Sequence, residues 1–222
     1  MSIDFKLLVF DWDGTLMDSE ARILDCVRAA AADLKLEIPD DDSIRNIIGL
    51  GLKEAVTTLF PGSDDARVAE VVAHYRHHFL DTNKTPSTLF AGVSGVLNEL
   101  SQRGYLLAVA TGKGRRGLDM VLDETGLGSL FHATRCADET LSKPHPEMLL
   151  QIMDELGTQA DETLMIGDTE YDMQMAKNAQ AHGLAVSYGV HEPARLLRHD
   201  PLGCLDEITD LTDWLDRHLK TD

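Results

Sequence analysis

Short apolar runs alternate with segments of helical periodicity from about Ser94 onward, and this alternation limits the possible folds more than any other feature of the chain. Four of the runs predict buried strands, at residues 106–110, 131–135, 163–166 and 184–188. Helices are expected at about 94–103, 115–124, 146–156 and 169–179. Strands that alternate with helices build a parallel sheet that is covered on both faces.

The segment that precedes Ser94 differs, because only helical patterns follow its first strand. An apolar run at residues 6–10 predicts that strand, and the helical patterns after it cover residues 19–34, 42–48, 52–59 and 65–80. We therefore expect an α/β fold with a doubly wound, mostly parallel, Rossmann-like sheet and a small all-helical cap domain. The predicted catalytic core comprises residues 1–15 and 86–222, and the predicted cap comprises residues 16–85.

Acidic residues outnumber basic ones, with 38 Asp and Glu against 20 Lys and Arg and a formal net charge of −18. This charge repels the phosphates of nucleic acids and anionic lipid headgroups, so neither nucleic acid nor a membrane is expected as a partner. A phosphorylated substrate would need local cations, from a metal ion or from Lys and Arg. The three cysteines form no closely spaced pair, and no apolar run suits a signal peptide or membrane span, so we expect a cytoplasmic protein.

The first predicted strand runs into the sequence Asp-Trp-Asp-Gly-Thr, which places Asp11 and Asp13 just beyond its carboxyl end. Ligands of open α/β sheets bind at this edge. Two carboxylates this close repel each other unless a cation lies between them. Asp and Gly are also common turn residues, so the meaning of this pair depends on what the other strand ends carry.

Polar residues also follow the second strand of the predicted core. Thr111 and Gly112 come directly after the run at 106–110, and they offer a hydroxyl and backbone N–H groups that suit a phosphate oxygen. Lys143 lies just before the helix predicted at 146–156, on a segment that two prolines stiffen. A lysine on such a segment can direct a fixed positive charge into a site.

The strand at 163–166 ends in a second acidic motif, Gly-Asp-Thr-Glu-Tyr-Asp. Asp168 lies at the end of the strand, and Asp172, four residues further on, faces the same side of the first helical turn. Acidic residues at a helix N-terminus often serve only to cap the helix. Capping would explain the presence of either Asp168 or Asp172 alone, but it explains the presence of both less well.

In chain order the motifs are Asp-x-Asp-Gly-Thr, a strand that ends in Thr, Lys-Pro, and Gly-Asp-Thr-x-x-Asp. This order resembles the haloacid dehalogenase (HAD) superfamily, and within it the phosphoglycolate phosphatase-like branch, whose cap is a helical insertion after the first strand. The resemblance covers essentially the whole chain. It implies a phosphatase, a phosphoric monoester hydrolase that depends on Mg²⁺ and acts on a small phosphorylated metabolite such as phosphoglycolate or a sugar phosphate.

The resemblance also implies catalytic roles for the motif residues. Asp11 would be the nucleophile that forms an aspartyl-phosphate intermediate, and Asp13 would be the general acid and base. Thr111, Gly112 and Lys143 would bind the phosphoryl group. This agrees with the chemistry, because phosphate monoester hydrolysis is very slow without groups that neutralise the transferring phosphoryl group.

The implied ligands of Mg²⁺ are carboxylates together with one backbone carbonyl. Asp11, Asp168 and the carbonyl of Asp13 would bind the ion by the resemblance. Asp172 would either support the metal site or orient Lys143, and both roles remain open at this point.

One segment of the predicted cap, residues 45–53, places two glycines beside two cations. By analogy with the same branch, the turn at Gly49 and Gly51 would close over the site. Arg45 or Lys53 would then contact a carboxylate of the substrate, although each is equally well explained as a solvated helix residue.

Other functions share some of these residues. A phosphonate hydrolase of the superfamily uses a cap lysine, for which Lys53 would serve, but its first motif resembles Asp-x-Ala, whereas Asp13 is present here. A phosphosugar mutase shares the core residues and differs mainly in whether the cap excludes water. A phospho-accepting signalling or binding module of receiver type lacks a cap and the second Asp of the first motif. Both a monomer and a homodimer are compatible with the sequence.

Overall fold

The computed structural model describes residues 4–218 and contains a six-stranded sheet in the order β5-β4-β1-β6-β7-β8. Its strands are β1 (Leu7–Phe10), β4 (Leu106–Thr111), β5 (Ala133–Cys136), β6 (Thr163–Gly167), β7 (His182–Val186) and β8 (Cys204–Leu205). Every neighbouring pair in this sheet is parallel. The α/β fold class expected from the alternating pattern is therefore confirmed, and β1 lies in the interior of the sheet.

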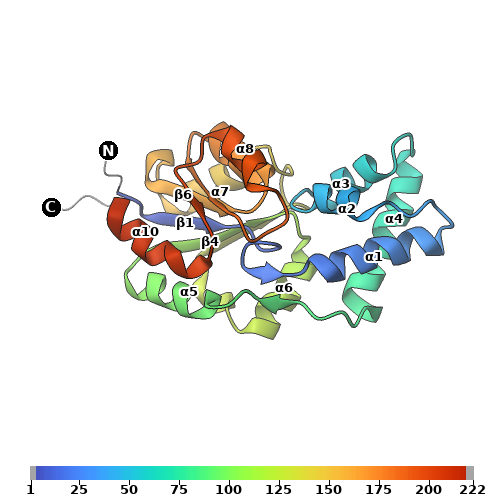
Figure 1. Cartoon of the computed structure of the whole chain (residues 1–222), viewed down its shortest axis with the longest axis horizontal. Coiled ribbons are helices and arrows are strands. Elements are labelled where there is room, and N and C mark those ends of the chain that lie inside the picture. The colour runs from blue at the N-terminus through green and yellow to red at the C-terminus, as the bar shows by residue number, and fades with distance from the viewer. Residues whose placement is uncertain (1–3, 219–222) are drawn as a thin grey trace.

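Helices cover both faces of the sheet (Figure 1). On one face lie α5 (Val93–Gln102), α6 (Arg115–Thr125) and α10 (Leu211–His218), and on the other lie α7 (Glu147–Leu156) and α8 (Glu170–Asn178). The side chains of β1 alternate between these two layers, because Leu8 and Phe10 join one apolar cluster while Leu7 and Val9 join the other. All four side chains are fully buried, which explains why the strand is a continuous apolar run.

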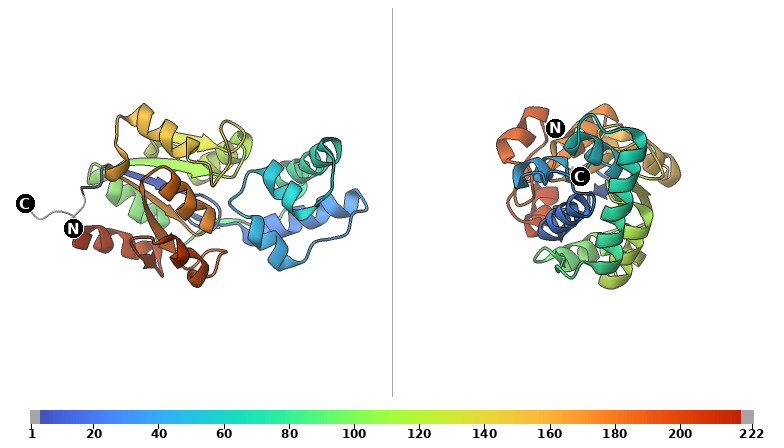
Figure 2. Two further views of the ribbon diagram at one scale, coloured as in Figure 1. Left: turned by 90° about the horizontal axis from the view of Figure 1, so that it is seen from above. Right: turned by 90° about the vertical axis from the view of Figure 1, so that its right-hand side faces the viewer.

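A separate group of helices lies beyond the carboxyl ends of the strands (Figure 2). These cap helices are α1 (Glu20–Asp33), α2 (Asp41–Ile47), α3 (Leu52–Leu59) and α4 (Asp65–His77), and α4 continues as a π-helical turn at His78–Thr82. They form two apolar clusters largely of their own residues. We interpret the chain as a core and a cap on this basis.

Two short strands that the sequence did not predict connect the cap helices to the core. β2 (Met17–Asp18) precedes α1, β3 (Thr88–Leu89) follows the cap helices, and the two pair in antiparallel orientation. Each has only two residues, which is too short to produce a recognisable pattern.

Two strands of the structure begin at residues other than those predicted from the sequence. The strand expected at 131–135 is β5, because Phe131 packs on the core from the preceding loop. The strand expected at 184–188 is β7, which begins at His182 because backbone pairing with β6 extends to residues that carry no apolar side chain. Among the described helices, none combines the length and apolar character needed to cross a bilayer.

The position of β1 inside the sheet leads to a stability prediction. Leu8→Ala should lower the free energy of unfolding by about 2–5 kcal/mol, because the removed methyl groups leave a cavity between fully packed layers. Urea unfolding measures this change. Leu197→Ala is the control, because that leucine is 52% exposed and should change stability by about 0.5 kcal/mol or less. Equal losses in the two variants would contradict the assignment of β1 to the core.

Candidate active site

The carboxyl ends of three neighbouring strands bring the acidic and hydroxyl motifs together. Phe10 of β1 is in register with Val109 of β4 and Ile166 of β6. The chain therefore places Asp11, Thr111 and Asp168 at one edge of the sheet, where all three are fully buried.

Lys143 enters this cluster from the turn that precedes α7. Its side chain is fully buried, and its Nζ lies 2.8 Å from Asp11 Oδ1 and 2.6 Å from Asp172 Oδ1. Burial opposes a charge on this lysine, but the Asp11 and Asp172 carboxylates outweigh burial and raise the pKa of Lys143. The ammonium group is therefore a fixed cation between two acids.

Asp11, Asp168 and Asp172 form a buried group of carboxylates. Each offers an oxygen that lies within 4.8 Å of the other two. Burial raises the pKa of Asp11 well above its usual value, although Lys143 opposes that shift. Burial, and then the Asp172 charge, raise the pKa of Asp168 to about 7. Three carboxylates and one ammonium group leave an excess of negative charge in a site with little access to water.

These residues fit a divalent cation. When all three carboxylates are ionised, their only buried cationic partner among the described residues is Lys143, so a bound cation would neutralise the remaining negative charge. The oxygens available are carboxylate oxygens, which are the donors that Mg²⁺ and Ca²⁺ prefer.

Asp168 is held by hydrogen bonds to both of its oxygens. Thr15 Oγ1 donates to Oδ1 at 2.7 Å, and the backbone N–H of Val190 donates to Oδ2 at 2.9 Å. Gly14 has a φ of +82°, and a Cβ there would lie 2.2 Å from Asp168 Oδ2. The glycine of the first motif is therefore required both by its conformation and by its contact with the second acidic motif.

Asp172 both caps a helix and contacts the buried lysine. Its Oδ2 accepts hydrogen bonds from Thr169 Oγ1 (2.6 Å) and Thr169 N (3.0 Å) in a capping box at the start of α8. Its Oδ1 faces Lys143. Asp172 thus contacts Lys143 and also belongs to the carboxylate group, so its position is compatible with both roles considered from the sequence.

Asp13 does not join the three buried carboxylates with its side chain. Its Oδ1 accepts a hydrogen bond from Ser19 Oγ (2.6 Å) and lies 3.0 Å from Lys113 Nζ. Lys113 is a site residue that sequence reasoning missed. Its side chain is 7% exposed, and its Nζ also lies 4.3 Å from the centre of the Phe79 ring. The sequence feature that could have revealed Lys113 is its position two residues after Thr111, just beyond the end of a predicted strand.

The loop between α2 and α3 lies directly against the phosphate-binding loop expected from the sequence. A Cβ on Gly112 would lie 2.4 Å from the carbonyl oxygen of Leu50, so the two backbones are in contact. Gly49 adopts a φ of +96°, and the N–H of Gly51 donates to Ser142 Oγ at 2.6 Å. The two cap glycines therefore allow the loop to reach the core.

The two cap cations predicted to contact substrate are paired elsewhere. Arg45 contacts Glu20 (2.7 Å) and Asp42 (3.0 Å) and does not line the cavity described below. Lys53 does line it, but its side chain is 68% exposed and lies 3.6 Å from Asp65. The structure therefore does not bring Arg45 to the site, because partners on the surface of the cap hold it.

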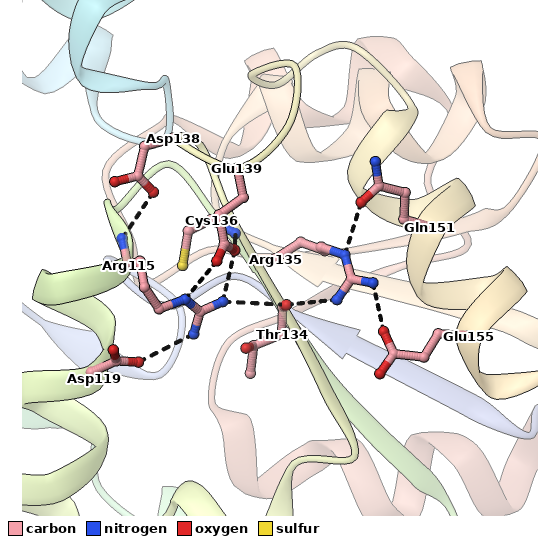
Figure 3. Close-up of polar contacts among 9 residues, drawn as sticks. All are labelled: Arg115, Asp119, Thr134, Arg135, Cys136, Asp138, Glu139, Gln151 and Glu155. Carbon is pink, nitrogen blue, oxygen red and sulfur yellow. Dashed lines mark hydrogen bonds and ion pairs between the residues drawn. The ribbon is translucent and has the colours of Figure 1, made fainter.

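A network of two arginines orders the loop after β5 (Figure 3). Arg115 and Arg135 both donate to the carbonyl oxygen of Thr134, at 3.4 and 2.9 Å. Arg115 also donates to Glu139, and its backbone N–H donates to Asp138 Oδ1 at 2.9 Å. Arg135 donates to Gln151 and Glu155 of α7. The network therefore ties Asp138 and Glu139 of this loop to Arg115 at the start of α6.

One cavity of about 770 Å³ extends from the strand ends into the cap helices. Asp11, Asp13 and Thr111 line one end of it, together with Gly112 and Lys113. Its volume lies within the range of pockets that bind small molecules. Residues of cap and core therefore border a single space that Asp11, Asp13 and Thr111 line, whereas Lys143 contacts Asp11 but does not itself line it.

His191 is buried beside this site, at 3% exposure. Its Nδ1 accepts a hydrogen bond from the backbone N–H of Glu170 at 3.1 Å, so that nitrogen carries no proton. Burial, reinforced by Arg195, lowers the pKa of His191 to about 4.

The family described as "Haloacid dehalogenase-like hydrolase" matches residues 8–186. A Dickeya dadantii protein named "Probable phosphatase IndB" is 35% identical, over 92% of this chain and 91% of its own length. A protein of Colwellia psychrerythraea named phosphoglycolate phosphatase is 28% identical, over 96% of this chain and 97% of its own. A solved hydrolase from Pseudomonas syringae has a TM-score of 0.88 at 21% identity and covers 97% of this chain and all of its own. This similarity to the solved hydrolase shows that the two chains share a fold.

The buried histidine predicts acid sensitivity. The folded-state pKa of His191 lies below its unfolded value of 6.5, so protons bind the unfolded chain more readily and stability falls as pH drops from about 6.5 to 4. The contribution of His191 to this loss is up to about 3 kcal/mol. Urea unfolding at several pH values should show a shallower decline for His191→Gln. His145→Gln, at an exposed position, should retain the wild-type slope, and identical slopes in all three proteins would refute the prediction.

Proposed function

This chain belongs to the haloacid dehalogenase-like hydrolases and is a phosphatase, and we propose that it hydrolyses a small phosphomonoester through an aspartyl phosphate on Asp11, with Mg²⁺ as its cofactor. The observation that carries the proposal is the buried contact of Lys143 with Asp11 and Asp172 at the end of a substrate-sized cavity. A buried cation and a carboxylate with one free oxygen are what phosphoryl transfer to an enzyme carboxylate requires.

Asp11 is suited to act as the nucleophile. Its Oδ1 is fixed by the Trp12 N–H at 2.7 Å and by Lys143 at 2.8 Å. Its Oδ2 makes no hydrogen bond with the described residues and remains available to attack phosphorus. The chain thus holds one oxygen and leaves the other free, which fixes the direction of attack.

Asp13 is the proposed general acid and base. It lines the cavity, and Ser19 and Lys113 fix its position through Oδ1. In the first step its carboxyl group would give a proton to the leaving alkoxide oxygen. In the second step it would take a proton from the water that attacks the aspartyl phosphate.

Three groups of this chain are proposed to bind the transferring phosphoryl group. Thr111 Oγ1 accepts a hydrogen bond from the Lys113 N–H at 3.2 Å, so its own hydroxyl proton can be donated to a phosphoryl oxygen. The N–H of Gly112, the next residue, and the ammonium group of Lys143 are the other two groups. Lys143 would neutralise charge that develops during transfer.

Asp11, Asp168, Asp172 and the backbone carbonyl of Asp13 are the proposed Mg²⁺ ligands. When bound, the ion would supply positive charge that lets an anionic phosphoryl group approach these carboxylates. Thr15 and Val190 orient Asp168 for this purpose, and Thr169 orients Asp172.

The first test of the mechanism is Asp11→Asn. The amide is a poor nucleophile of nearly the same shape, so phosphatase activity should fall by at least about 10³-fold while the fold is retained. Phosphate release measures the activity, and circular dichroism checks the fold. Asp18→Asn is the matched control, because this acid lies in the same segment but is exposed. A fully active Asp11→Asn protein would rule out the covalent mechanism.

The second test removes the metal. Treatment with a chelator should abolish hydrolysis, and added Mg²⁺ should restore it, because the carboxylate group otherwise repels a phosphate. Thermal unfolding gives a second readout. Saturating Mg²⁺ should raise the Tm of the wild type and have little effect on Asp168→Asn, which lacks one ligand charge. Undiminished hydrolysis in excess chelator would contradict the proposed cofactor.

A further inference from the structure

We propose that the substrate carries an extended apolar group, aromatic or aliphatic, which occupies the part of the cavity inside the cap. This inference rests on the proposed function and specifies the substrate class of the same site. It departs from the expectation of phosphoglycolate or a sugar phosphate, for two reasons that the cavity itself provides.

The first reason is the character of the cavity wall. Beyond the end formed by Asp11 and Thr111, the cavity passes between cap helices, where its wall includes Ile23, Val27, Ile47, Val56, Val71 and Phe79. Each of these side chains is at most 7% exposed, yet each borders the open space. An apolar group placed there would be removed from water at about 25 cal/mol per Å².

Hydroxyl groups of a sugar would find few partners on this part of the wall. The polar lining residues Glu54, His77, Asp81 and Asp138 are exposed, and Tyr75 is half-buried. A hydroxyl that loses its water without gaining a hydrogen bond costs about 1–3 kcal/mol. A sugar phosphate buried there would bring several such groups. The apolar wall therefore favours a substrate with few polar atoms beyond its phosphate.

The second reason is the placement of the cations. Lys113, near the phosphoryl end, is buried against Asp13. Arg76 and Arg116 also line the cavity, but their side chains are 52% and 77% exposed and lie 4.0 Å from Asp138 and 3.5 Å from Asp81. Lys53 is likewise exposed. Among the described residues that line the cavity, the one buried cation, Lys113, is already paired with Asp13. A second carboxylate on the substrate would thus meet this neutralised cation, apolar side chains deep in the cap, or cations at the exposed boundary.

Four phosphate esters with alkoxide leaving groups test the proposal. They are benzyl phosphate, n-hexyl phosphate, 2-phosphoglycolate and glucose 6-phosphate, each assayed with Mg²⁺ for phosphate release. We expect kcat/KM for the first two to exceed the values for the last two by about 10-fold or more. A higher kcat/KM for either polar ester would overturn this inference and leave the proposed function intact. No hydrolysis of any of the four would overturn both.

A pair of variants on α4 tests the position of the apolar group. Val71 lines the cavity, whereas Val68, one turn earlier and equally buried, does not. Val71→Phe should lower the ratio of kcat/KM for benzyl phosphate to that for 2-phosphoglycolate by about 10-fold, because the added ring occupies the space. Val68→Phe should leave this ratio unchanged even if it destabilises the cap. Equal ratios in both variants would place the organic group elsewhere and overturn the inference.

Discussion

The Lys143 ammonium group, buried between Asp11 and Asp172, is the interaction on which the arrangement of the site depends. Removing one member of such a buried set typically costs about 3–5 kcal/mol, because the remaining charges lose their partner. The contact also joins three distant parts of the chain, namely the end of β1, the start of α8 and the turn before α7. A separate network of two arginines around Thr134 orders the loop that follows β5 (Figure 3).

Close backbone approach complements these charges. The residues around Asp168 leave no room for a side chain at Gly14 or at Gly189, where a Cβ would lie 2.2 Å from atoms of that aspartate. Asp168 is therefore fixed by packing as well as by its bonds to Thr15 and Val190. A site held in this way needs little reorganisation when a charged group binds.

The sequence predicted those parts of the fold that depend on local pattern. Continuous apolar runs marked β1, β4 and β6, and the polar residues after them could be placed at one edge by the rules of parallel sheets. It could not predict β2, β3 or β8, whose two residues each are positioned by long-range pairing.

The candidate site shows the same division between local and long-range information. The contact of Lys113 with Asp13 and Phe79 depends on residues from three separate segments, and the pairing of Arg45 with Glu20 joins two helices. A charge in a loop has no periodicity that reveals its partner. The apolar cavity wall was equally hidden, because cap residues that line a cavity have the same spacing as residues that fill a core.

The pairing of β2 with β3 has a consequence for how the cap can move. Both chain connections between cap and core pass through this pair, with Met17 beside Leu89 and Asp18 beside Thr88. Because the two connections pair with each other, bending one without the other would break that pairing. A rotation of the cap that kept the pair intact would carry the apolar cavity wall away from Asp11 as a unit.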